Sequence, residues 1–379
     1  MNITFLIRSL DVGGAERQLA SLARGLQENG HCVAVAVFYS GGGLERDLEG
    51  TGVELVNLEK RGRWDLVGFF LRAVKFLKSH KIDVLHSYLP GANIIATLAG
   101  RTTPEVPVVW AVAASNMDMS EYDLTAKITY WLEAKLSKSA TLIISNSESS
   151  LECAVARGFP RDKMIVLPNP HDIDAFKYDI DGRSRVRREW GVDDEEILIG
   201  TVARFDVMKD HPNFVRAAGL ISSQHKNLRF TCIGKSDLVY LDELKQLAIE
   251  SGVGDKFIWP GPRADMADVY SALDISTCSS SFGEGLPNAI GEAMSCQTPC
   301  VVTDVGDCAR IVGDTGVVVL PRSAEALADG WSEMIARMEV EGDSVGLKAR
   351  ERIVNEFSKD RAVYLTDIEL EKLTKINHT

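Results

Sequence analysis

Residues 281–296 read SFGEGLPNAIGEAMSC, a loop followed by the start of a helix. Glu284 lies between glycines, Pro287 occupies a position where the first turn of a helix tolerates proline, and Glu292 follows inside the helix. An apolar run at Thr298–Thr303 then predicts a strand. A loop that opens a helix between two strands is a place where open α/β sheets bind ligands. Free N–H groups at the start of such a helix favour oxygen-rich or anionic groups.

The charges near this loop indicate a ligand that carries both hydroxyls and phosphates. Two carboxylates would repel a bare phosphate, so we expect Glu284 and Glu292 to accept hydrogen bonds from hydroxyl groups. Arg204 and Lys209 follow the first strand of the same half of the chain, and they would neutralise a diphosphate and stabilise it as a leaving group. An ordinary solvated loop could also carry two such basic residues. Taken together, the four side chains predict a sugar nucleotide, with hydroxyls at both ends and a diphosphate between them.

Length and composition are those of a globular protein of two or three domains. The chain has 379 residues, 45% hydrophobic and 25% charged. Its seven cysteines include no Cys-x-x-Cys pair, so we expect reduced thiols in a cytosolic protein, without a zinc site or a disulfide framework. The first apolar run is too short for a signal peptide, and no stretch of about 18 uncharged apolar residues predicts a membrane span. The net charge is −12, which makes nucleic-acid binding unlikely.

Apolar runs alternate with helical patterns along the whole chain. In residues 1–170 the predicted strands are Asn2–Arg8, Cys32–Phe38, Val53–Leu58, Asp83–His86, Val106–Trp110, Thr141–Ser145 and Lys163–Leu167. A polar segment at His171–Arg188 is interpreted as a linker that leads into a new helix. The strands predicted after it are Ile197–Val202, Leu228–Ile233, Lys256–Trp259, Asp274–Thr277, Pro299–Thr303 and Gly316–Leu320.

This alternation is typical of parallel sheets with helices on both faces. The predicted fold class is α/β, with two Rossmann-like, doubly wound parallel-sheet domains that face each other across a cleft. We assign residues 1–170 to an N-terminal domain on the acceptor side and residues 171–358 to a nucleotide-sugar-binding domain. Residues 359–379 are expected to form a helix that crosses back to the first domain.

Gly13 and Gly14 lie between the first predicted strand and its helix. They resemble half of a dinucleotide-binding fingerprint, but the full Gly-x-Gly-x-x-Gly is absent, so NAD binding has little support. A tight turn without a ligand would explain the pair. Their place at the carboxyl end of a strand favours close approach of the backbone to a phosphate or a sugar.

Other strand ends supply the remaining candidates. His86 ends a predicted strand and is a candidate catalytic residue, although a buried histidine held by backbone groups would give the same pattern. Asn116 and Asp118 lie in another strand-end loop and are candidate acceptor contacts. Gly234 and Arg263, the latter in the turn Gly-Pro-Arg, are expected near the nucleotide base.

The segment Lys60–Lys81 carries seven Lys and Arg residues and one acid, with four aromatic residues among them. A basic aromatic helix can lie on an anionic bilayer, where each basic residue contributes roughly 1 kcal/mol. The apolar spacing within the segment also fits a helix packed on the sheet with its basic face in water. Both interpretations can hold together.

These motifs resemble a GT-B glycosyltransferase of family 4 (glycosyl transferases group 1), a retaining class with many polysaccharide and lipopolysaccharide enzymes. The resemblance covers most of the chain. It is carried by Gly13-Gly14-Ala15-Glu16, Asp83-Val84-Leu85-His86, Val166-Leu167-Pro168-Asn169, the pair Arg204 and Lys209, and Glu284 with Glu292 at the family's Glu-x7-Glu spacing. The last of these elements is the most specific.

The resemblance implies a role for each residue. Glu292 would hold the ribose diol of the donor, and Glu284 would contact the hydroxyls of the donor sugar. Arg204 and Lys209 would bind the diphosphate. The donor-binding backbone around Glu284 would comprise Gly285, Leu286, Pro287 and Asn288, and Gly13 and Gly14 would close over the sugar and phosphate from the opposite domain.

No metal and no other cofactor are expected from the resemblance. Asp172-Ile-Asp174 in the linker is not expected to be a metal-binding Asp-x-Asp element, because the positive side chains do the work that a metal does elsewhere. Retention could proceed by attack on the front face, with the departing phosphate oxygen taking the proton of the acceptor.

Two positions depart from the family pattern. Ala113 stands where many relatives have His or Arg, so another side chain supplies that contact, the acceptor chemistry differs, or catalysis is weak. Pro170-His171 replaces the commoner Gly-Ile after Asn169.

The resemblance therefore implies a retaining, metal-independent hexosyltransferase. It would move a sugar from a nucleotide-diphosphate donor to a glycan or lipid-linked acceptor, in the synthesis of cell-surface polysaccharide or lipopolysaccharide. A sugar-nucleotide epimerase of the same fold and a donor-binding subunit with little catalysis are the alternatives. We expect a cytoplasmic protein, peripheral on the inner face of the plasma membrane, with no nucleic-acid partner.

Overall fold

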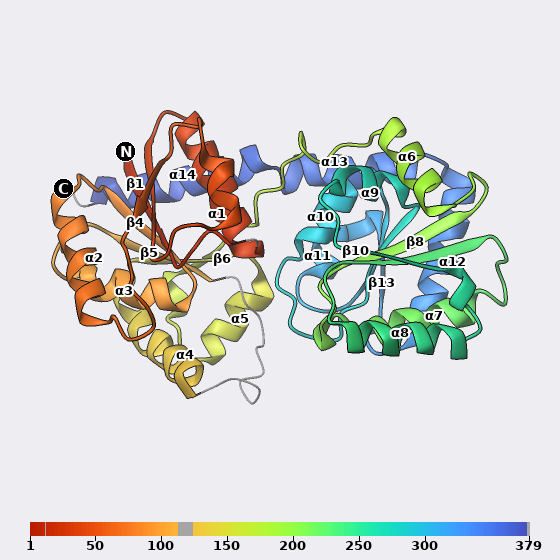
Figure 1. Ribbon diagram of the computed structural model, residues 1–379. Coiled ribbons are helices and arrows are strands. Elements are labelled where there is room, and N and C mark those ends of the chain that lie inside the picture. Colours follow the sequence, from red (N-terminus) through yellow and green to blue (C-terminus); the bar gives the residue numbers. More distant parts are fainter. Residues whose placement is uncertain (12, 113–123, 377–379) are drawn as a thin grey trace. The chain divides into compact units, whose positions relative to one another are not determined.

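The computed structural model describes residues 1–11, 13–112 and 124–376, and it divides into two compact units (Figure 1). Unit 1 is Met1–Pro170 together with the final helix α14 (Lys359–Ile376), and unit 2 is His171–Ser358. Each unit is built on its own parallel sheet.

The sheet of unit 1 has seven strands in the order β3-β2-β1-β4-β5-β6-β7. Its strands are β1 (Asn2–Ile7), β2 (Cys32–Val37), β3 (Glu54–Asn57), β4 (Val84–Tyr88), β5 (Val108–Val112), β6 (Leu142–Ser145) and β7 (Met164–Val166). The chain builds outward from β1 to β3 and then returns to place β4 on the other side of β1. The loops that follow β1 and β4 therefore flank the point where the strand order reverses, which is the usual ligand position in open α/β sheets.

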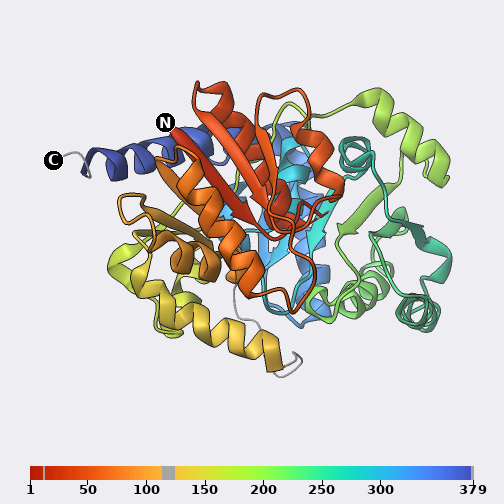
Figure 2. The ribbon, with the colours of Figure 1, turned by 60° about the vertical axis from the view of Figure 1, so that its left-hand side comes forward.

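Helices cover both faces of this sheet. They are α1 (Gly14–Glu28), α2 (Val67–Ser79), α3 (Pro90–Gly100), α4 (Leu124–Leu136) and α5 (Glu148–Ala156). One apolar core holds residues of α1 and α14, and the other holds residues of α2, α3 and α5. The final helix packs against α1 (Figures 1 and 2). A Cβ at Gly25 would overlap Val363, so the glycine permits this close approach, and Lys359 forms an ion pair with Glu28 at 3.2 Å.

The sheet of unit 2 has six strands in the order β10-β9-β8-β11-β12-β13. They are β8 (Ile197–Val202), β9 (Leu228–Ile233), β10 (Phe257–Gly261), β11 (Ile275–Cys278), β12 (Cys300–Thr303) and β13 (Val317–Val319). The strand order reverses between β8 and β11, so the loops after these two strands lie at the switch point. These are the loops that carry Lys209 and Glu284.

The helices of unit 2 form two layers. One apolar core contains residues of α6 (Ile180–Trp190), α9 (Met266–Ala272), α10 (Asn288–Ser295), α11 (Cys308–Val312) and α13 (Ser344–Glu356). The opposite core contains residues of α7 (His211–Ile221), α8 (Leu238–Glu250) and α12 (Ala324–Glu341). All strand pairs in both sheets are parallel, as predicted.

The interpretation of His171–Arg188 as a linker was wrong over its second half, because α6 begins at Ile180. Asp179 caps this helix by accepting hydrogen bonds from the backbone N–H groups of its first turn. The segment appeared polar because it contains several arginines. Arg183 and Arg187 both pair with Asp274, at 2.7 and 2.9 Å. These ion pairs offset the free-energy cost of removing the two charged groups from water.

Two smaller features of the helices also differ from the prediction. The helix after Glu284 begins at Asn288, so Pro287 is its N-cap rather than a residue of its first turn. The short helix α11 was not predicted from the sequence.

Candidate functional site

The loop that carries Glu284 is held against the loop after β8. The backbone N–H of Ser281 donates to the carbonyl of Met208 at 2.9 Å, and the hydroxyl of Ser279 donates to the carbonyl of Lys209 at 2.8 Å. Gly283 has φ +79°, and a Cβ there would lie 2.6 Å from the sulfur of Met208. This glycine therefore allows the two loops to meet, and their contact determines where Glu284 and Lys209 lie.

Glu284 is 5% exposed, and several donors converge on one of its oxygens. Its Oε1 accepts from Nζ of Lys209 at 2.5 Å and from the hydroxyl of Ser280. Sγ of Cys278 lies 3.9 Å from the same oxygen. Burial lowers the pKa of Lys209, but the charge of Glu284 and the hydrogen bond outweigh it, so the pKa of Lys209 is raised. Lys209 is therefore a cation at neutral pH.

A third loop, after β12, supports the backbone of Glu284 and Gly285. The N–H of Asp307 donates to the carbonyl of Gly285 at 2.9 Å. Gly306 has φ +61°, and a Cβ there would overlap the carbonyl of Glu284. The Glu284 loop is thus fixed on two sides by neighbouring loops of the same sheet end.

Glu292 lies on α10 and is 8% exposed. Its Oε2 accepts a hydrogen bond of 2.9 Å from the hydroxyl of Tyr270, which is on α9. Burial, together with the charge of Glu292, raises the pKa of Tyr270 well above its ordinary value, so its hydroxyl stays protonated and donates. The helix itself rests on His171, because a Cβ at Gly291 would overlap the His171 ring.

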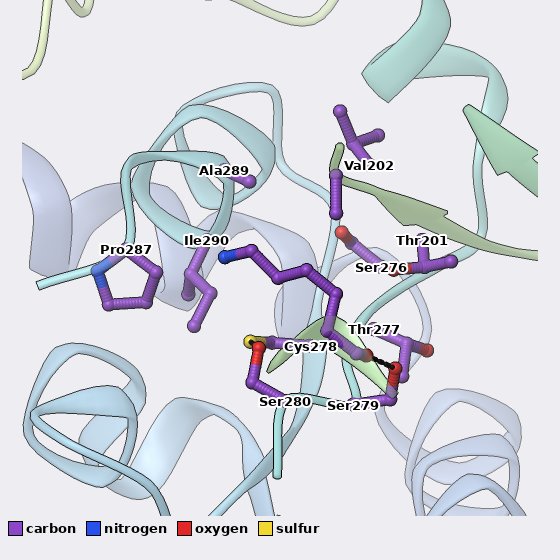
Figure 3. Close-up of a pocket in the computed structure, with 12 residues that line it drawn as sticks. Thr201, Val202, Ser276, Thr277, Cys278, Ser279, Ser280, Pro287, Ala289 and Ile290 are labelled. Carbon is purple, nitrogen blue, oxygen red and sulfur yellow. Dashed lines mark hydrogen bonds between the residues drawn. The ribbon is translucent and has the colours of Figure 1, made fainter. Parts of the chain in front are cut away.

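A small pocket opens beside these groups at the switch point (Figure 3). Its walls come from the ends of β8 and β11 and from the first turn of α10, and Lys209 also lines it. Cys278 and Ser280 from the end of β11 and the loop after it, and Pro287 and Ile290 from the start of α10, are among its lining residues. The pocket therefore combines a cation, hydroxyls and the start of a helix, and such a set can bind an anionic group that carries hydroxyls.

Arg204, Gly234 and Arg263 lie around the same sheet end. Arg204 follows β8 and is exposed. Gly234 has φ +153° and a Cβ there would overlap the carbonyl of Ala203, so the loops after β8 and β9 are in close contact. Arg263 pairs with Glu189 at 2.5 Å and Asp265 at 2.8 Å, and these two carboxylates raise its pKa. The predicted donor contacts of these residues stay predictions.

In unit 1, Gly13 is the N-cap of α1 and Gly14 is its first residue. A Cβ at Gly13 would overlap the carboxylate of Glu16, so the first turn of α1 folds closely over this position. The glycine pair therefore forms a helix start next to the strand-order reversal of this sheet.

His86 lies inside β4, two residues before its end at Tyr88. Its ring is 1% exposed and is packed between Phe5 and Tyr88, with ring centroids 5.2 and 4.9 Å away. Burial lowers the pKa of His86 to about 3, and neither ring nitrogen has a hydrogen-bond partner among the residues that the structure describes. The side chain is therefore neutral at physiological pH. Asn116, Asp118 and Ala113 lie outside the described residues.

Sequence reasoning did not single out Ser280, Cys278 and Tyr270. Ser280 lies in the run of three serines before Glu284, and this run was a signal that could have indicated a hydroxyl donor. Tyr270 lies on another helix than Glu292, and nothing in the sequence spacing relates the two. Within residues 1–11, 13–112 and 124–376, no group of three or more His, Cys, Asp or Glu side chains could hold a metal ion.

Comparison with known families identifies the chain. Residues 196–337 match the model of "Glycosyl transferases group 1", and residues 12–175 match that of "Glycosyltransferase Family 4". The chain belongs to glycosyltransferase family 4. The first segment holds all six strands of the unit 2 sheet, the second holds the strands of the unit 1 sheet from β2 onward, and the predicted family is confirmed.

Similar proteins match most of this family 4 chain. A protein of Methanocaldococcus jannaschii, described as an uncharacterized glycosyltransferase, is 26% identical over 372 residues, covering 92% of this chain and 90% of that protein. A second relative is an α-1,4-N-acetyl-D-galactosaminyltransferase of Campylobacter jejuni, whose named acceptor is a diNAcBac-PP-undecaprenol glycan. It is 27% identical, and the match covers 78% of this chain and 77% of that protein.

Solved structures confirm the fold class. Anabaena HepE in complex with UDP has a TM-score of 0.83 and 21% identity, and the match covers 98% of this chain and all of that one. HepE in complex with UDP-glucose has the same TM-score, 20% identity and the same coverage. The two parallel-sheet α/β units are those of the GT-B fold, as predicted, and a glycosyltransferase is the enzyme class that the family supports.

Proposed function

We propose that this protein is a retaining glycosyltransferase that moves a sugar from a nucleotide-diphosphate donor to a glycan or lipid-linked acceptor. The observation that carries the proposal is the pairing of Lys209 with Glu284 at 2.5 Å beside a pocket at the switch point of the sheet. A cation and a carboxylate held there offer one group to phosphate oxygens and one to sugar hydroxyls.

Each side chain has a task in this proposal. Lys209 and the exposed Arg204 bind the diphosphate and neutralise the charge that develops as it leaves. Glu284 accepts hydrogen bonds from the sugar, and its orientation is held by Ser280. Glu292 accepts from the ribose diol, and the hydroxyl of Tyr270 keeps its carboxylate aligned.

The departing phosphate oxygen serves as the base for the acceptor hydroxyl, on the face from which it leaves. The new glycosidic bond forms on the same face, and the configuration is retained. The proton that the acceptor loses goes to the phosphate, and the two basic side chains supply the positive charge without a metal ion. The GT-B neighbour HepE, whose structures hold UDP and UDP-glucose, supports a uridine nucleotide as the first donor to test.

For the acceptor we propose a lipid-linked glycan, in the synthesis of cell-surface polysaccharide or lipopolysaccharide. Support comes from the Campylobacter relative, whose name specifies an undecaprenol diphosphate acceptor. No helix among the described residues is long and apolar enough to cross a membrane. Such an acceptor would have to be reached from the surface of the bilayer.

Unit 1 offers a surface suited to this contact. In the first segment, Trp64, just before α2, is 81% exposed, and Leu71 on α2 is exposed as well. In the second segment, Ile128 and Trp131 on α4 are exposed. Arg63 hydrogen-bonds Thr125 and so joins the two segments. We therefore propose peripheral attachment to anionic lipid through this face, on the cytoplasmic side of the membrane, with basic residues contributing roughly 1 kcal/mol each.

The membrane proposal is tested by sedimentation with vesicles of neutral or anionic phospholipid at low and high salt. We expect binding to anionic vesicles that weakens as salt increases, and its loss in W64S/W131S. The matched control is L238S/V340S, which removes two exposed apolar residues of unit 2, at 78% and 86% exposure. Equal recovery on neutral and anionic vesicles would contradict the proposal.

The enzymatic proposal is tested in two steps. A thermal-shift screen of nucleotides and sugar nucleotides first identifies the donor, since a ligand at about 100 times its Kd stabilises the folded state by roughly 2.7 kcal/mol. Incubation with that donor alone then gives slow hydrolysis in a glycosyltransferase, whereas an epimer would indicate an epimerase. Adding lipid-linked glycans gives transfer, and the anomeric configuration of the product is read by NMR.

The site is assigned by comparing Glu284→Ala with Glu339→Ala, an exposed glutamate on α12. We expect the first variant to abolish transfer and the second to leave it unchanged. Donor binding without transfer to any acceptor would instead indicate a binding subunit, and transfer that survives in Glu284→Ala would refute the assignment of the site.

A further inference from the structure

One wall of the pocket carries a thiol, Cys278, that is in contact with a second thiol buried behind it, Cys308. Sγ of Cys278, at the end of β11, lies 3.9 Å from Sγ of Cys308, the first residue of α11. Both cysteines are free. A disulfide requires the sulfurs to approach to about 2.05 Å, so they must come roughly 2 Å closer than they are here.

The two thiols differ in their access to solvent. Cys278 lines the pocket and is partly exposed, whereas Cys308 is fully buried behind it. Figure 3 shows the Cys278 sulfur next to the hydroxyl of Ser280. A small molecule that enters the pocket therefore meets Cys278 first.

The surroundings also favour reaction at Cys278. The thiol of Cys308 hydrogen-bonds Cys278 and lowers its pKa, and Lys209 adds to this effect, while burial and the charge of Glu284 oppose it. The thiolate is the form of cysteine that attacks oxidants. A thiol with a second thiol in contact also has a partner to resolve its first oxidation product.

We propose that Cys278 and Cys308 are a site of reversible oxidation by a peroxide, and that the disulfide they form weakens binding of the nucleotide donor. The second half of this inference rests on the proposed function. The pair lies 30 residues apart in sequence, in the same compact unit.

The reaction balances in two steps. The Cys278 thiolate attacks one oxygen of hydrogen peroxide, so an S–O bond forms and the O–O bond breaks, and the departing hydroxide takes a proton to become water. The sulfur of Cys308 then attacks the sulfur of Cys278. The S–S bond forms, the S–O bond breaks, and the second hydroxide leaves as water with the proton of Cys308. Two thiols are oxidised and one peroxide is reduced to two waters.

The disulfide would reach the donor site through contacts already present. Cys278 is 3.9 Å from Oε1 of Glu284, and a bond to Cys308 draws its sulfur toward α11 instead. The turn before α11 holds the Glu284 loop, because Asp307 donates to the carbonyl of Gly285 at 2.9 Å. Movement at Cys308 therefore displaces the backbone on which Glu284 lies.

The experiment treats the full chain with hydrogen peroxide, blocks the remaining thiols, and maps disulfide-linked peptides by mass spectrometry. We expect a Cys278–Cys308 peptide with the mass of two hydrogens lost, reversed by dithiothreitol. Cys308→Ser should instead leave Cys278 as a sulfenic acid that traps with dimedone. The control is Cys300→Ala, which removes another buried thiol of the same sheet and should still form the disulfide.

Donor binding is measured by calorimetry with UDP as the probe. We expect the oxidised protein to bind UDP roughly tenfold more weakly, a change of about 1.4 kcal/mol, with recovery after dithiothreitol. Peroxide should leave UDP binding by Cys308→Ser less affected. Absence of the linked peptide overturns the thiol site, and a linked peptide with unchanged UDP affinity overturns the coupling to the donor. A reduced protein that fails to bind UDP would refute the proposed donor, while the peptide map still decides whether the disulfide forms.

Discussion

The Lys209–Glu284 pair should be strongly coupled, and a double-mutant cycle with Lys209→Met and Glu284→Gln measures the coupling. The side chains are 19% and 6% exposed, and the N–O distance is 2.5 Å. The pair is thus a buried, charge-assisted hydrogen bond, a class that contributes about 1.5–3 kcal/mol. We expect a coupling energy in that range, measured by urea unfolding at pH 7.

The single variants should differ in a characteristic way. Lys209→Met leaves the carboxylate of Glu284 buried with its ion partner removed, so it should cost more stability than Glu284→Gln, whose amide still accepts from Ser280. The Lys348–Glu341 pair at 2.8 Å, with Lys348 56% exposed, is the matched surface control and should show much weaker coupling.

The pH dependence provides a second check. The folded-state pKa of Lys209 is raised, so its contribution is complete below the unfolded pKa of about 10.4 and is lost as pH rises through the higher folded value. The stability difference between the wild type and Lys209→Met should therefore be constant from pH 6 to 9. Single-variant effects that add within about 0.5 kcal/mol would refute the reasoning, because independent sites behave in that way.

Three further outcomes are expected. Tyr270→Phe removes the hydrogen bond to Glu292 and should cost about 1 kcal/mol in urea unfolding and weaken nucleotide binding in calorimetry; unchanged binding would contradict the role of this contact. Gly234→Ala should lower the free energy of unfolding in urea by more than about 1 kcal/mol, because its Cβ would overlap the carbonyl of Ala203 at a φ of +153°. Stability equal to that of the wild type would show that the loop can relax. The pKa of His86 in the folded state is lowered to about 3, so the unfolded state binds more protons below pH 6.5, and the free energy of unfolding should fall as pH falls from there. His86→Phe should flatten this loss in unfolding curves measured at several pH values. An unchanged pH profile would contradict the burial argument.

Most of the secondary structure could be predicted from the sequence. The strands β8 and β9 have the predicted bounds, because each is a mostly apolar run between polar segments. Helix α6 could not be recognised by its apolar pattern, since Arg187 is buried within it. The ion pair with Asp274, 87 residues later, and hydrogen bonds to three backbone carbonyls offset the cost of that burial.

Part of the candidate site could also be predicted from the sequence. Glu284, Glu292 and Lys209 were chosen for their chemistry and for their place after strands, and the structure brings Lys209 and Glu284 into contact. The run of serines around Ser280 was a weak signal, but Tyr270 gave none, because a hydroxyl donor is defined by what it faces rather than by its own sequence context.

The sequence by itself determined the two parallel sheets, since alternating apolar runs and amphipathic segments can bury their surfaces in few other ways. It also determined the set of charged residues available at the strand ends. The tertiary structure decided which of them meet. Lys209 and Glu284 are 75 residues apart, and the sulfurs of Cys278 and Cys308 come together only because β8, β11 and β12 are neighbours whose carboxyl ends share one edge. Hydrogen bonds and ion pairs depend on distances of a few ångströms, and such distances are set by packing between segments that the local sequence does not relate.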